Sequence, residues 1–194
     1  MKNIILIGAG GHANSVYDVV MSTKKFKIEK ILDNKSGIQN KNFYGKKIYQ
    51  TESFLKENVI KKNIHLSFGS IYNLKKRYDL INKLEKKKIY KFPTIISPKS
   101  YIARNVTILD GSIIMHNSII NSGSTLLKNV VVNTKAIIEH DVRIGNNSHI
   151  STGAIVNGGV QIGNNCFVGS GSIIRENVSI PNNTFIKMGS IIKK

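Results

Sequence analysis

The sequence predicts a chain of two parts, an α/β unit of the βαβαβ kind over residues 1–92 and an all-β unit of stacked short strands over residues 93–194. Two observations predict this division. A glycine-rich turn follows an apolar strand near the N-terminus, and an aliphatic residue recurs at every sixth position of the second half. A chain of 194 residues is long enough for one large domain or two small ones, so each part can bury a core.

The first unit opens with an apolar strand at residues 3–8 and the turn GAGGHA at residues 8–13, followed by a helix at residues 14–23. The turn matches the pattern G-x-G-x-x-A in the strand–turn–helix setting of Rossmann-like folds. Its glycines let the backbone approach a phosphate, and the helix N-terminus supplies N–H donors and a positive dipole. His12, inside the motif, could contact a sugar or a phosphate, or it could equally cap the helix.

The remainder of the first unit alternates helices and strands, with strands expected at residues 27–34 and 64–69 and helices at residues 51–58 and 71–88. Asp33 ends the second strand and follows the glycines by about 20 residues, which is where a ribose-binding acid lies in a dinucleotide fold. The unit is only half of a full dinucleotide domain. We therefore expect it to bind one nucleotide or a nucleotide sugar rather than NAD.

Every sixth residue from Ile96 to Ile192 is aliphatic, without a gap. From Val142 onward, the residue two places before each of them is small or short and β-branched. Residues i and i−2 of a strand lie on the same face. Glycine and asparagine, which tolerate positive φ, crowd the remaining positions and predict a turn after each strand.

Three such strands and turns make a triangular coil of about 18 residues, and stacked coils share one continuous core. The aliphatic residues are expected to point into the prism and the small ones to fill its corners. Residues 96–194 give about five and a half coils with no insertion. Cys166, the single cysteine, falls at a small inward position, so we interpret it as core filler rather than as a nucleophile.

The charge balance is strongly basic, with 29 Lys+Arg against 11 Asp+Glu and a net charge of +18. Such an excess attracts nucleic acid, anionic membranes or phosphorylated small molecules, although it could equally be a solvated lysine-rich surface. The lysines are dispersed and Trp is absent, which favours phosphorylated metabolites over nucleic acid. No apolar run is long enough to span a bilayer or to form a signal segment, so we expect a cytoplasmic protein without membrane insertion.

Two of the five histidines, His140 and His149, lie nine residues apart in the stretch EHDVRIGNNSH. An imidazole changes its charge near neutral pH and is suited to remove a proton from an attacking amine or hydroxyl. The neighbouring Asp141 could fix the tautomer of such a base. Turn histidines of a repeat can also be merely exposed, as is expected at His116. Two histidines with loosely placed acids are too few ligands for zinc, so no metal site is predicted.

The repeats of the second unit resemble those of the hexapeptide-repeat, left-handed β-helix acyltransferases. Together with GAGGHA and EHDVRIGNNSH, they extend the resemblance over nearly the whole chain, to the PglD/NeuD-like sugar acetyltransferases. Members of that family carry a GxxGH motif near the N-terminus and an E-H-[ED] triplet followed by a second histidine. The resemblance implies a homotrimer with acetyl-CoA as co-substrate, bound between neighbouring prisms, and no metal.

The resemblance also implies roles for particular residues. His140 would be the general base and Asp141 its orienting acid. The acceptor would contact residues of both units: Gly8, Gly10, Gly11, His12, Asp33, Asn133 and His149. Acetyl-CoA would contact three residues of the prism: His149, Gly158 and Met188, the last at a position where relatives more often carry glycine. His149 could alternatively serve only to pack a trimer interface.

The length of one coil gives a separate argument for His140 as the base. Position 158 lies one coil above it and is glycine, and position 122 lies one coil below it and is serine. A glycine over the histidine leaves open space and an accessible backbone N–H. A thioester carbonyl that gains negative charge during acyl transfer would need such a donor.

The predicted function is acetyl-CoA-dependent N-acetylation of the amino group of a nucleotide-linked 4-amino-4,6-dideoxy sugar, with His140 as general base. The glycine turn and Asp33 favour a nucleotide-linked acceptor. One alternative is O-acetylation of a sialic-acid-type sugar, which the repeats do not distinguish. A second alternative is a non-catalytic nucleotide-sugar binding module, against which the intact pair of His140 and Asp141 argues.

Overall fold

A computed structural model describes residues 1–35, 37–38, 41–57, 61–69 and 74–194. The chain forms two compact units, Met1–Pro93 and Thr94–Lys194, and each is described by itself. The boundary that we propose, after residue 92, lies one residue before this division. Within the described ranges, no helix is both long and apolar enough to cross a membrane.

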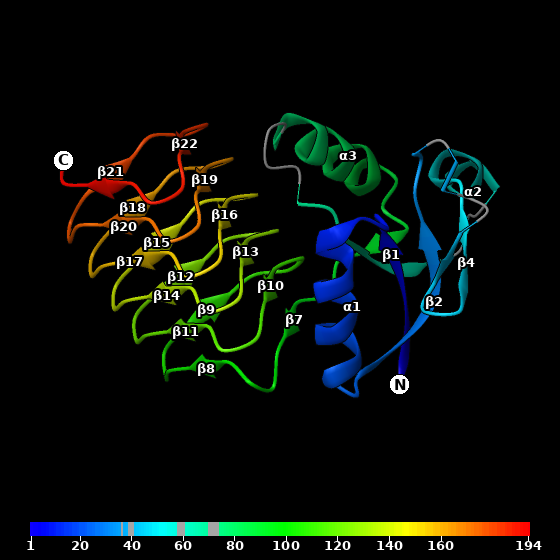
Figure 1. The fold of residues 1–194 in the computed structure, drawn as a ribbon, viewed down its shortest axis with the longest axis horizontal. Helices are drawn as coiled ribbons and strands as arrows, with labels where there is room; N and C mark the ends of the chain where they lie inside the picture. The colour runs from blue at the N-terminus through cyan, green and yellow to red at the C-terminus, as the bar shows by residue number, and fades with distance from the viewer. Residues whose placement is uncertain (36, 39–40, 58–60, 70–73) are drawn as a thin grey trace. The chain divides into compact units, whose positions relative to one another are not determined.

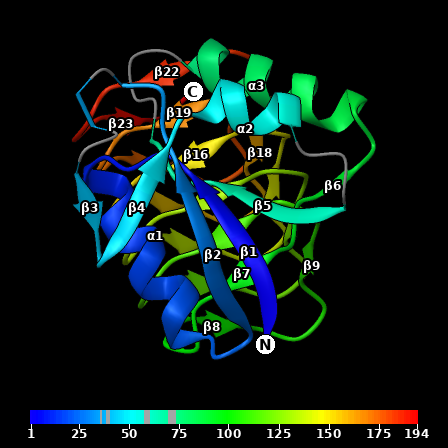
Figure 2. The same ribbon diagram turned by 90° about the vertical axis from the view of Figure 1, so that its right-hand side faces the viewer.

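The first unit is built on a six-stranded sheet in the order β3-β4-β2-β1-β5-β6. Its strands are β1 (Lys2–Ile7), β2 (Phe26–Leu32), β3 (Asn42–Phe43), β4 (Lys46–Tyr49), β5 (Lys62–Leu66) and β6 (Tyr90–Lys91). All neighbours pair in parallel except β3 and β4, which form an antiparallel pair. Figure 2 shows β2, β1 and β5 side by side in this sheet. The predicted strands correspond to β1, β2 and β5, whereas β3, β4 and β6 are too short to show a periodic pattern.

Three helices cover the sheet: α1 (Gly11–Ser22), α2 (Thr51–Glu57) and α3 (Leu74–Lys86). Figure 1 shows α1 and α2 on opposite sides of the sheet. Side chains of α2 and α3 share one core with β1 and β5. Helix α1 begins at Gly11, earlier than predicted, so the end of the glycine motif forms its first turn. The predicted helices also included residue 58 and residues 71–73, which lie outside the described residues, and residues 87–88, where the structure has a turn after the end of α3.

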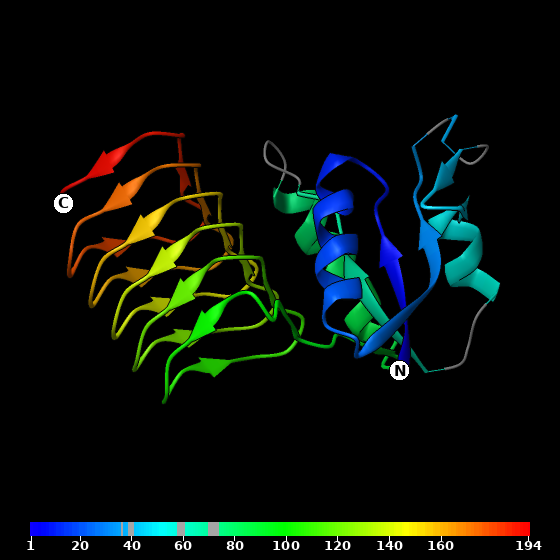
Figure 3. The same cartoon turned by 60° about the horizontal axis from the view of Figure 1, so that its bottom comes forward.

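The second unit is a left-handed β-helix of two-residue strands, as predicted (Figures 1 and 3). Its strands are β7 (Ile95–Ile96), β8 (Tyr101–Ile102), β9 (Thr107–Ile108), β10 (Ile113–Ile114), β11 (Ile119–Ile120), β12 (Thr125–Leu126), β13 (Val131–Val132), β14 (Ile137–Ile138), β15 (Arg143–Ile144), β16 (His149–Ile150), β17 (Ile155–Val156), β18 (Gln161–Ile162), β19 (Phe167–Val168), β20 (Ile173–Ile174), β21 (Ser179–Ile180), β22 (Phe185–Ile186) and β23 (Ile191–Ile192). Each strand pairs in parallel with the strand one coil away, as β14 does with β11 and β17. The three faces of the prism are therefore three parallel sheets.

The core of the prism consists of the second residue of each strand and the small residue two places before it. The aliphatic series is buried from Ile114 to Ile186, whereas Ile96 at the first coil is 39% exposed because a terminal coil has a neighbour on one side only. Cys166 is buried in this core, and its burial raises the pKa of the thiol. A raised thiol pKa leaves little thiolate at neutral pH, which agrees with core filler rather than a nucleophile.

The corners of the prism use one left-handed residue in every six, from Asn105 to Gly189. All of these residues are glycine or asparagine except Lys135 and Asp141, whose φ angles are 59° and 58°. The short side chain of aspartate tolerates this conformation and can bond locally. Asp141 therefore occupies a turn position whose backbone is fixed by the repeat itself, and this fixes the direction of its carboxylate.

Candidate active site

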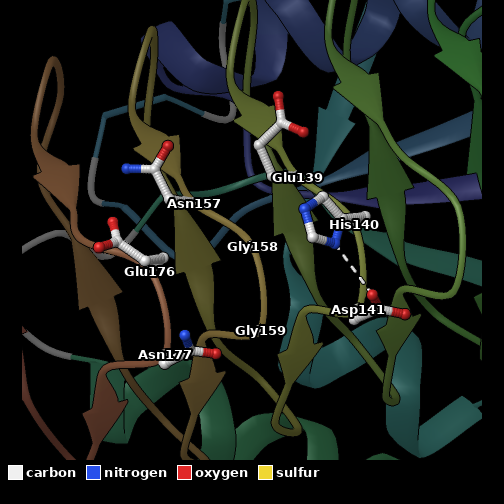
Figure 4. Close-up of a pocket in the computed structure, with 8 residues that line it drawn as sticks. All are labelled: Glu139, His140, Asp141, Asn157, Gly158, Gly159, Glu176 and Asn177. Atoms are coloured by element: carbon white, nitrogen blue, oxygen red, sulfur yellow. Dashed lines mark hydrogen bonds and ion pairs between the residues drawn. The ribbon is translucent and has the colours of Figure 1, made fainter.

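His140 and Asp141 form a hydrogen-bonded pair at the corner that follows β14. The Nδ1 of His140 lies 2.9 Å from Oδ2 of Asp141, and both side chains are exposed, at 66% and 71%. A carboxylate at Nδ1 favours the tautomer with its hydrogen on that nitrogen, which leaves Nε2 of the neutral ring unprotonated. The pair therefore has the arrangement of a base and its orienting acid (Figure 4).

A pocket of about 530 Å³ opens beside this pair, and residues of three successive coils line it. The lining residues are Glu139, His140, Asp141, Asn157, Gly158, Gly159, Glu176 and Asn177 (Figure 4). The first three were recognisable in the sequence as the E-H-D triplet. Gly158 was predicted as well. The sequence analysis missed the other four lining residues, although they lie one or two coil lengths after the triplet: Asn157, Gly159, Glu176 and Asn177.

Gly158 faces the imidazole of His140 from the next coil. A Cβ atom added at this glycine would lie 2.7 Å from both Nε2 and Cε1 of His140, closer than any real contact of a methyl group. The absence of a side chain at Gly158 therefore leaves the space that the imidazole of His140 occupies. The backbone N–H of Gly158 takes part in no hydrogen bond between described residues, so it remains available to a ligand.

The carboxylate of Asp141 also depends on a glycine of a neighbouring coil for its space. It rests on Gly123, one coil below, where an added Cβ would overlap its Oδ1. Glu139 is turned toward the same lower coil and accepts a hydrogen bond of 2.9 Å from the side-chain amide of Asn121. Glu176, two coils above His140, pairs with Arg175 at 2.9 Å and stays exposed. Apart from His140, the charged residues that line the pocket are therefore all acids.

Replacing Gly123 with alanine tests how Asp141 is positioned. We expect the value of kcat to fall about tenfold or more, because the new methyl group displaces the carboxylate from the imidazole. Gly123→Ala also costs about 1–2 kcal/mol in the left-handed backbone. Gly153 is the matched control, since its φ of +65° resembles the +76° of Gly123 and no atom lies within 4 Å of its added Cβ. Equal kcat values for the two variants would contradict the positioning role of Gly123.

The other prism residues that the resemblance implies do not line this pocket in the described chain. His149 lies on β16 at the outward-facing position that we expected, yet it is only 4% exposed. Its ring packs edge-to-face against Phe167 at 5.1 Å, and its Nε2 lies 3.4 Å from the side-chain amide of Asn133. Met188, in contrast, is 80% exposed near the last coil.

The glycine turn of the first unit is shaped for a close approach of another group. Gly8 has a φ of +117°, and an added Cβ there would lie 3.0 Å from the backbone N of Phe68, so only glycine fits. Added Cβ atoms at Gly10 and Gly11 meet nothing within 4 Å. Gly10 is the N-cap of α1 and provides no side-chain hydrogen bond, so the first N–H groups of the helix are not capped in this way. The N–H groups of Gly10 and Gly11 form no hydrogen bond between described residues and are open donors, whereas the N–H of Ala13 donates to the carbonyl of Gly10.

Asp33 braces this turn, a role that the sequence did not reveal. Its Oδ2 accepts a hydrogen bond of 2.8 Å from the N–H of Ala9, and its Oδ1 accepts one of 2.8 Å from the N–H of Lys35. Burial and, to a smaller extent, the nearby charge of Arg77 together lower the pKa of His12 to about 4. His12 is therefore neutral at pH 7. Among the described residues, no cluster of three His, Cys, Asp or Glu side chains could hold a metal ion.

Family models match parts of both units. The model of the PglD N-terminal domain matches residues 3–84, and the model of the bacterial transferase hexapeptide (six repeats) matches residues 159–194. Among curated proteins, no sequence match reaches significance.

Solved structures share the fold over the whole chain. The acetyltransferase domain of PglB from Neisseria gonorrhoeae FA1090 is 24% identical, with a TM-score of 0.88, over 100% of this chain and 92% of that one. PerB from Caulobacter crescentus, solved in complex with CoA and GDP-perosamine, is 21% identical, with a TM-score of 0.86, over 100% and 90%. WeeI from Acinetobacter baumannii AYE is 21% identical, with a TM-score of 0.85, over 100% and 92%. At these identities the likeness establishes the fold.

The first unit thus matches a PglD N-terminal domain, the end of the second unit matches transferase hexapeptide repeats, and a histidine–aspartate pair lies at a corner of the same prism. In these features the chain is similar to the hexapeptide-repeat acyltransferases and, among them, to the PglD-like sugar acetyltransferases, as its motifs predicted.

Proposed function

We propose that this protein transfers the acetyl group of acetyl-CoA to the amino group of a nucleotide-linked 4-amino-4,6-dideoxy sugar. The observation that carries the proposal is the pocket in which His140 and Asp141 face the free N–H of Gly158. The similar PglB domain has been solved in complex with acetyl coenzyme A, and PerB in complex with CoA and GDP-perosamine. These complexes support the choice of donor and acceptor class. The proposal includes a cytoplasmic location.

The proposed reaction is a direct transfer. Nε2 of His140 removes a proton from the amine as its nitrogen attacks the thioester carbonyl, and Asp141 stabilises the resulting imidazolium. The carbonyl oxygen gains negative charge, and the N–H of Gly158 would donate a hydrogen bond to it. The C–N bond then forms an amide, the C–S bond breaks, and the thiolate of coenzyme A takes up the proton that the imidazolium returns. No covalent enzyme intermediate is needed, which agrees with the buried Cys166.

The charges of the pocket favour an amine over a sialic acid. Glu139, Asp141 and Glu176 all line it, so a cationic ammonium acceptor is attracted and an anionic carboxylate sugar is repelled. This supports N-acetylation over the alternative of sialic-acid O-acetylation. The acceptor's nucleotide is proposed to bind the first unit at Gly8, Gly10, Gly11, His12 and Asp33. Asn133 and His149 are proposed to contact the sugar, and His149 and Met188 the coenzyme.

We also propose that the protein is a homotrimer. The side chains of His140 and Asp141 are more than half exposed, and an exposed base is poorly shielded from water unless another surface covers it. A neighbouring prism would provide that cover. Light scattering should therefore give three times the 21.6 kDa of one chain. A stable monomer with full activity would contradict a site between prisms.

The test of the proposed function is a thiol-release assay with acetyl-CoA and a panel of acceptors. The panel contains UDP-, GDP- and dTDP-linked 4-amino sugars together with free sialic acid. We expect rapid release of thiol with one amino-sugar nucleotide. Release with sialic acid alone would favour the O-acetyltransferase, and binding of a nucleotide sugar without any release would favour the non-catalytic binding module.

A further inference from the structure

Three side chains with basic groups lie near one another in the first unit: His12 on α1, His65 on β5 and Arg77 on α3. Arg77 is 4% exposed, and its Nη1 donates a hydrogen bond of 3.0 Å to the carbonyl of Leu66 at the end of β5. The next residue, Ser67, donates its hydroxyl hydrogen to the carbonyl of Gly8 at 2.7 Å. The carbonyl that accepts the hydrogen bond of Arg77 therefore belongs to the residue next to Ser67, which contacts Gly8.

Arg77 carries the positive charge of this group at neutral pH. Burial lowers its pKa to about 10, so it stays protonated. Burial lowers the pKa of His65 to about 3, and the charges of Arg77 and His12 act in the same direction. His12, with a pKa of about 4, is neutral as well. The charge of Arg77 also lowers the pKa of both histidines, after burial, and His12 lies in the first turn of α1.

No carboxylate among the described residues balances this charge. Arg77 forms no ion pair with an Asp or Glu side chain among the described residues. Burial is the one influence on the pKa of Arg77, with no contribution from an acid. The Nε2 atom of His65 is also buried and has no hydrogen-bond partner among the described residues. A buried charge without a counter-charge is costly, and an anion that binds nearby recovers part of that cost.

We propose that Arg77 is the counter-charge for the diphosphate of a nucleotide-linked ligand that binds over Gly8, Gly10 and Gly11. The choice of a diphosphate rests on the proposed acceptor. Two features act in the same direction on such a ligand. The N–H groups of Gly10 and Gly11 donate hydrogen bonds to its phosphate oxygens, and the buried guanidinium supplies a full positive charge nearby. Arg77 is thus a positioning residue that acts through the field it creates, and it need not touch the ligand.

Calorimetric binding to the intact protein tests the proposal. The tightest of UDP, GDP and dTDP is chosen first, and its affinity is compared with that of the matching nucleoside, which lacks phosphate. Arg77→Gln removes the buried charge, and Lys83→Gln removes one exposed charge from the same helix as a matched control. We expect Arg77→Gln to weaken the nucleoside diphosphate at least about tenfold and the nucleoside by less than about twofold. Lys83→Gln should change neither affinity.

The contrary results are equally distinct. Unchanged binding of the diphosphate, or equal losses for diphosphate and nucleoside, would leave Arg77 with a role in the fold alone. If Arg77→Gln does not fold, Arg77→Lys replaces it, and this variant should bind the diphosphate within about threefold of the parent because it keeps the charge. A loss beyond tenfold with Arg77→Lys would overturn the proposal, as would a parent protein that binds none of the three nucleotides. Binding that depends on Arg77 without acetyl transfer would refute the proposed function and leave this inference standing.

Discussion

Replacing His140 with alanine is expected to lower the rate of acetyl transfer by about 10²–10⁴-fold, the usual contribution of a general base. The imidazole is more than half exposed and takes no part in the core, so the fold should be unaffected. Affinity for the acceptor should stay close to that of the parent, because the nucleotide is proposed to bind the other unit. Thiol release at saturating acetyl-CoA measures kcat, and calorimetry measures acceptor binding.

His116 provides the matched control for this experiment. It occupies the equivalent hexad position at a different corner, where its Nδ1 lies 2.5 Å from the hydroxyl of Ser97, and it does not line the pocket. His116→Ala should therefore leave kcat unchanged. If His140→Ala and His116→Ala reduce kcat equally little, His140 is not the base and the proposed mechanism is wrong.

Gly158→Ala is expected to lower kcat by about 100-fold, because a displacement of about 1 Å in a reacting group can have an effect of that size. The added methyl group would lie 2.7 Å from Nε2 of His140, so the imidazole must turn away from its place. The effect should depend on the imidazole itself. In a protein that already carries His140→Ala, adding Gly158→Ala should therefore change the residual rate by less than about twofold.

The double variant distinguishes this steric account from others. If the two substitutions multiply in their effects, Gly158 acts on the coenzyme or on the fold and not on the base. Thermal unfolding of Gly158→Ala should occur close to that of the parent, since the glycine lies at an open pocket and has no left-handed φ. A large loss of stability would likewise contradict the account.

The prism could be predicted almost residue by residue because each of its coils repeats the same constraint. An inward aliphatic residue and a left-handed turn recur every six residues. The place of a residue in the six-residue repeat therefore determines whether it is buried in the core, exposed or part of a turn. The hairpin of β3 and β4 carries no such repetition, and its two- and four-residue strands depend on the pairing of β4 with β2, which lies far away in the sequence. It was accordingly missed.

The residues of the candidate sites also fall into two groups, those that the repeat predicts and those that it does not. The spacing of one coil placed Gly158 over His140 from the sequence, and the structure has the two in contact range. The burial of His149 was not predicted, because its contacts with Phe167 and Asn133 depend on side-chain conformations that the repeat does not specify. Arg77 was missed for a different reason. In sequence it is one of many basic residues of a helix, and only the packing of that helix buries it without an acid.

The central claim is that this protein forms an amide on an amino sugar, and analysis of the product tests it most directly. The protein would be incubated with acetyl-CoA and the acceptor that gives the fastest thiol release, and the product examined by mass spectrometry before and after treatment with hydroxylamine. We predict a nucleotide sugar heavier by one acetyl group whose mass hydroxylamine does not change, because an amide resists conditions that cleave an ester. Loss of the acetyl group on treatment, or thiol release without any acetylated product, would contradict the account.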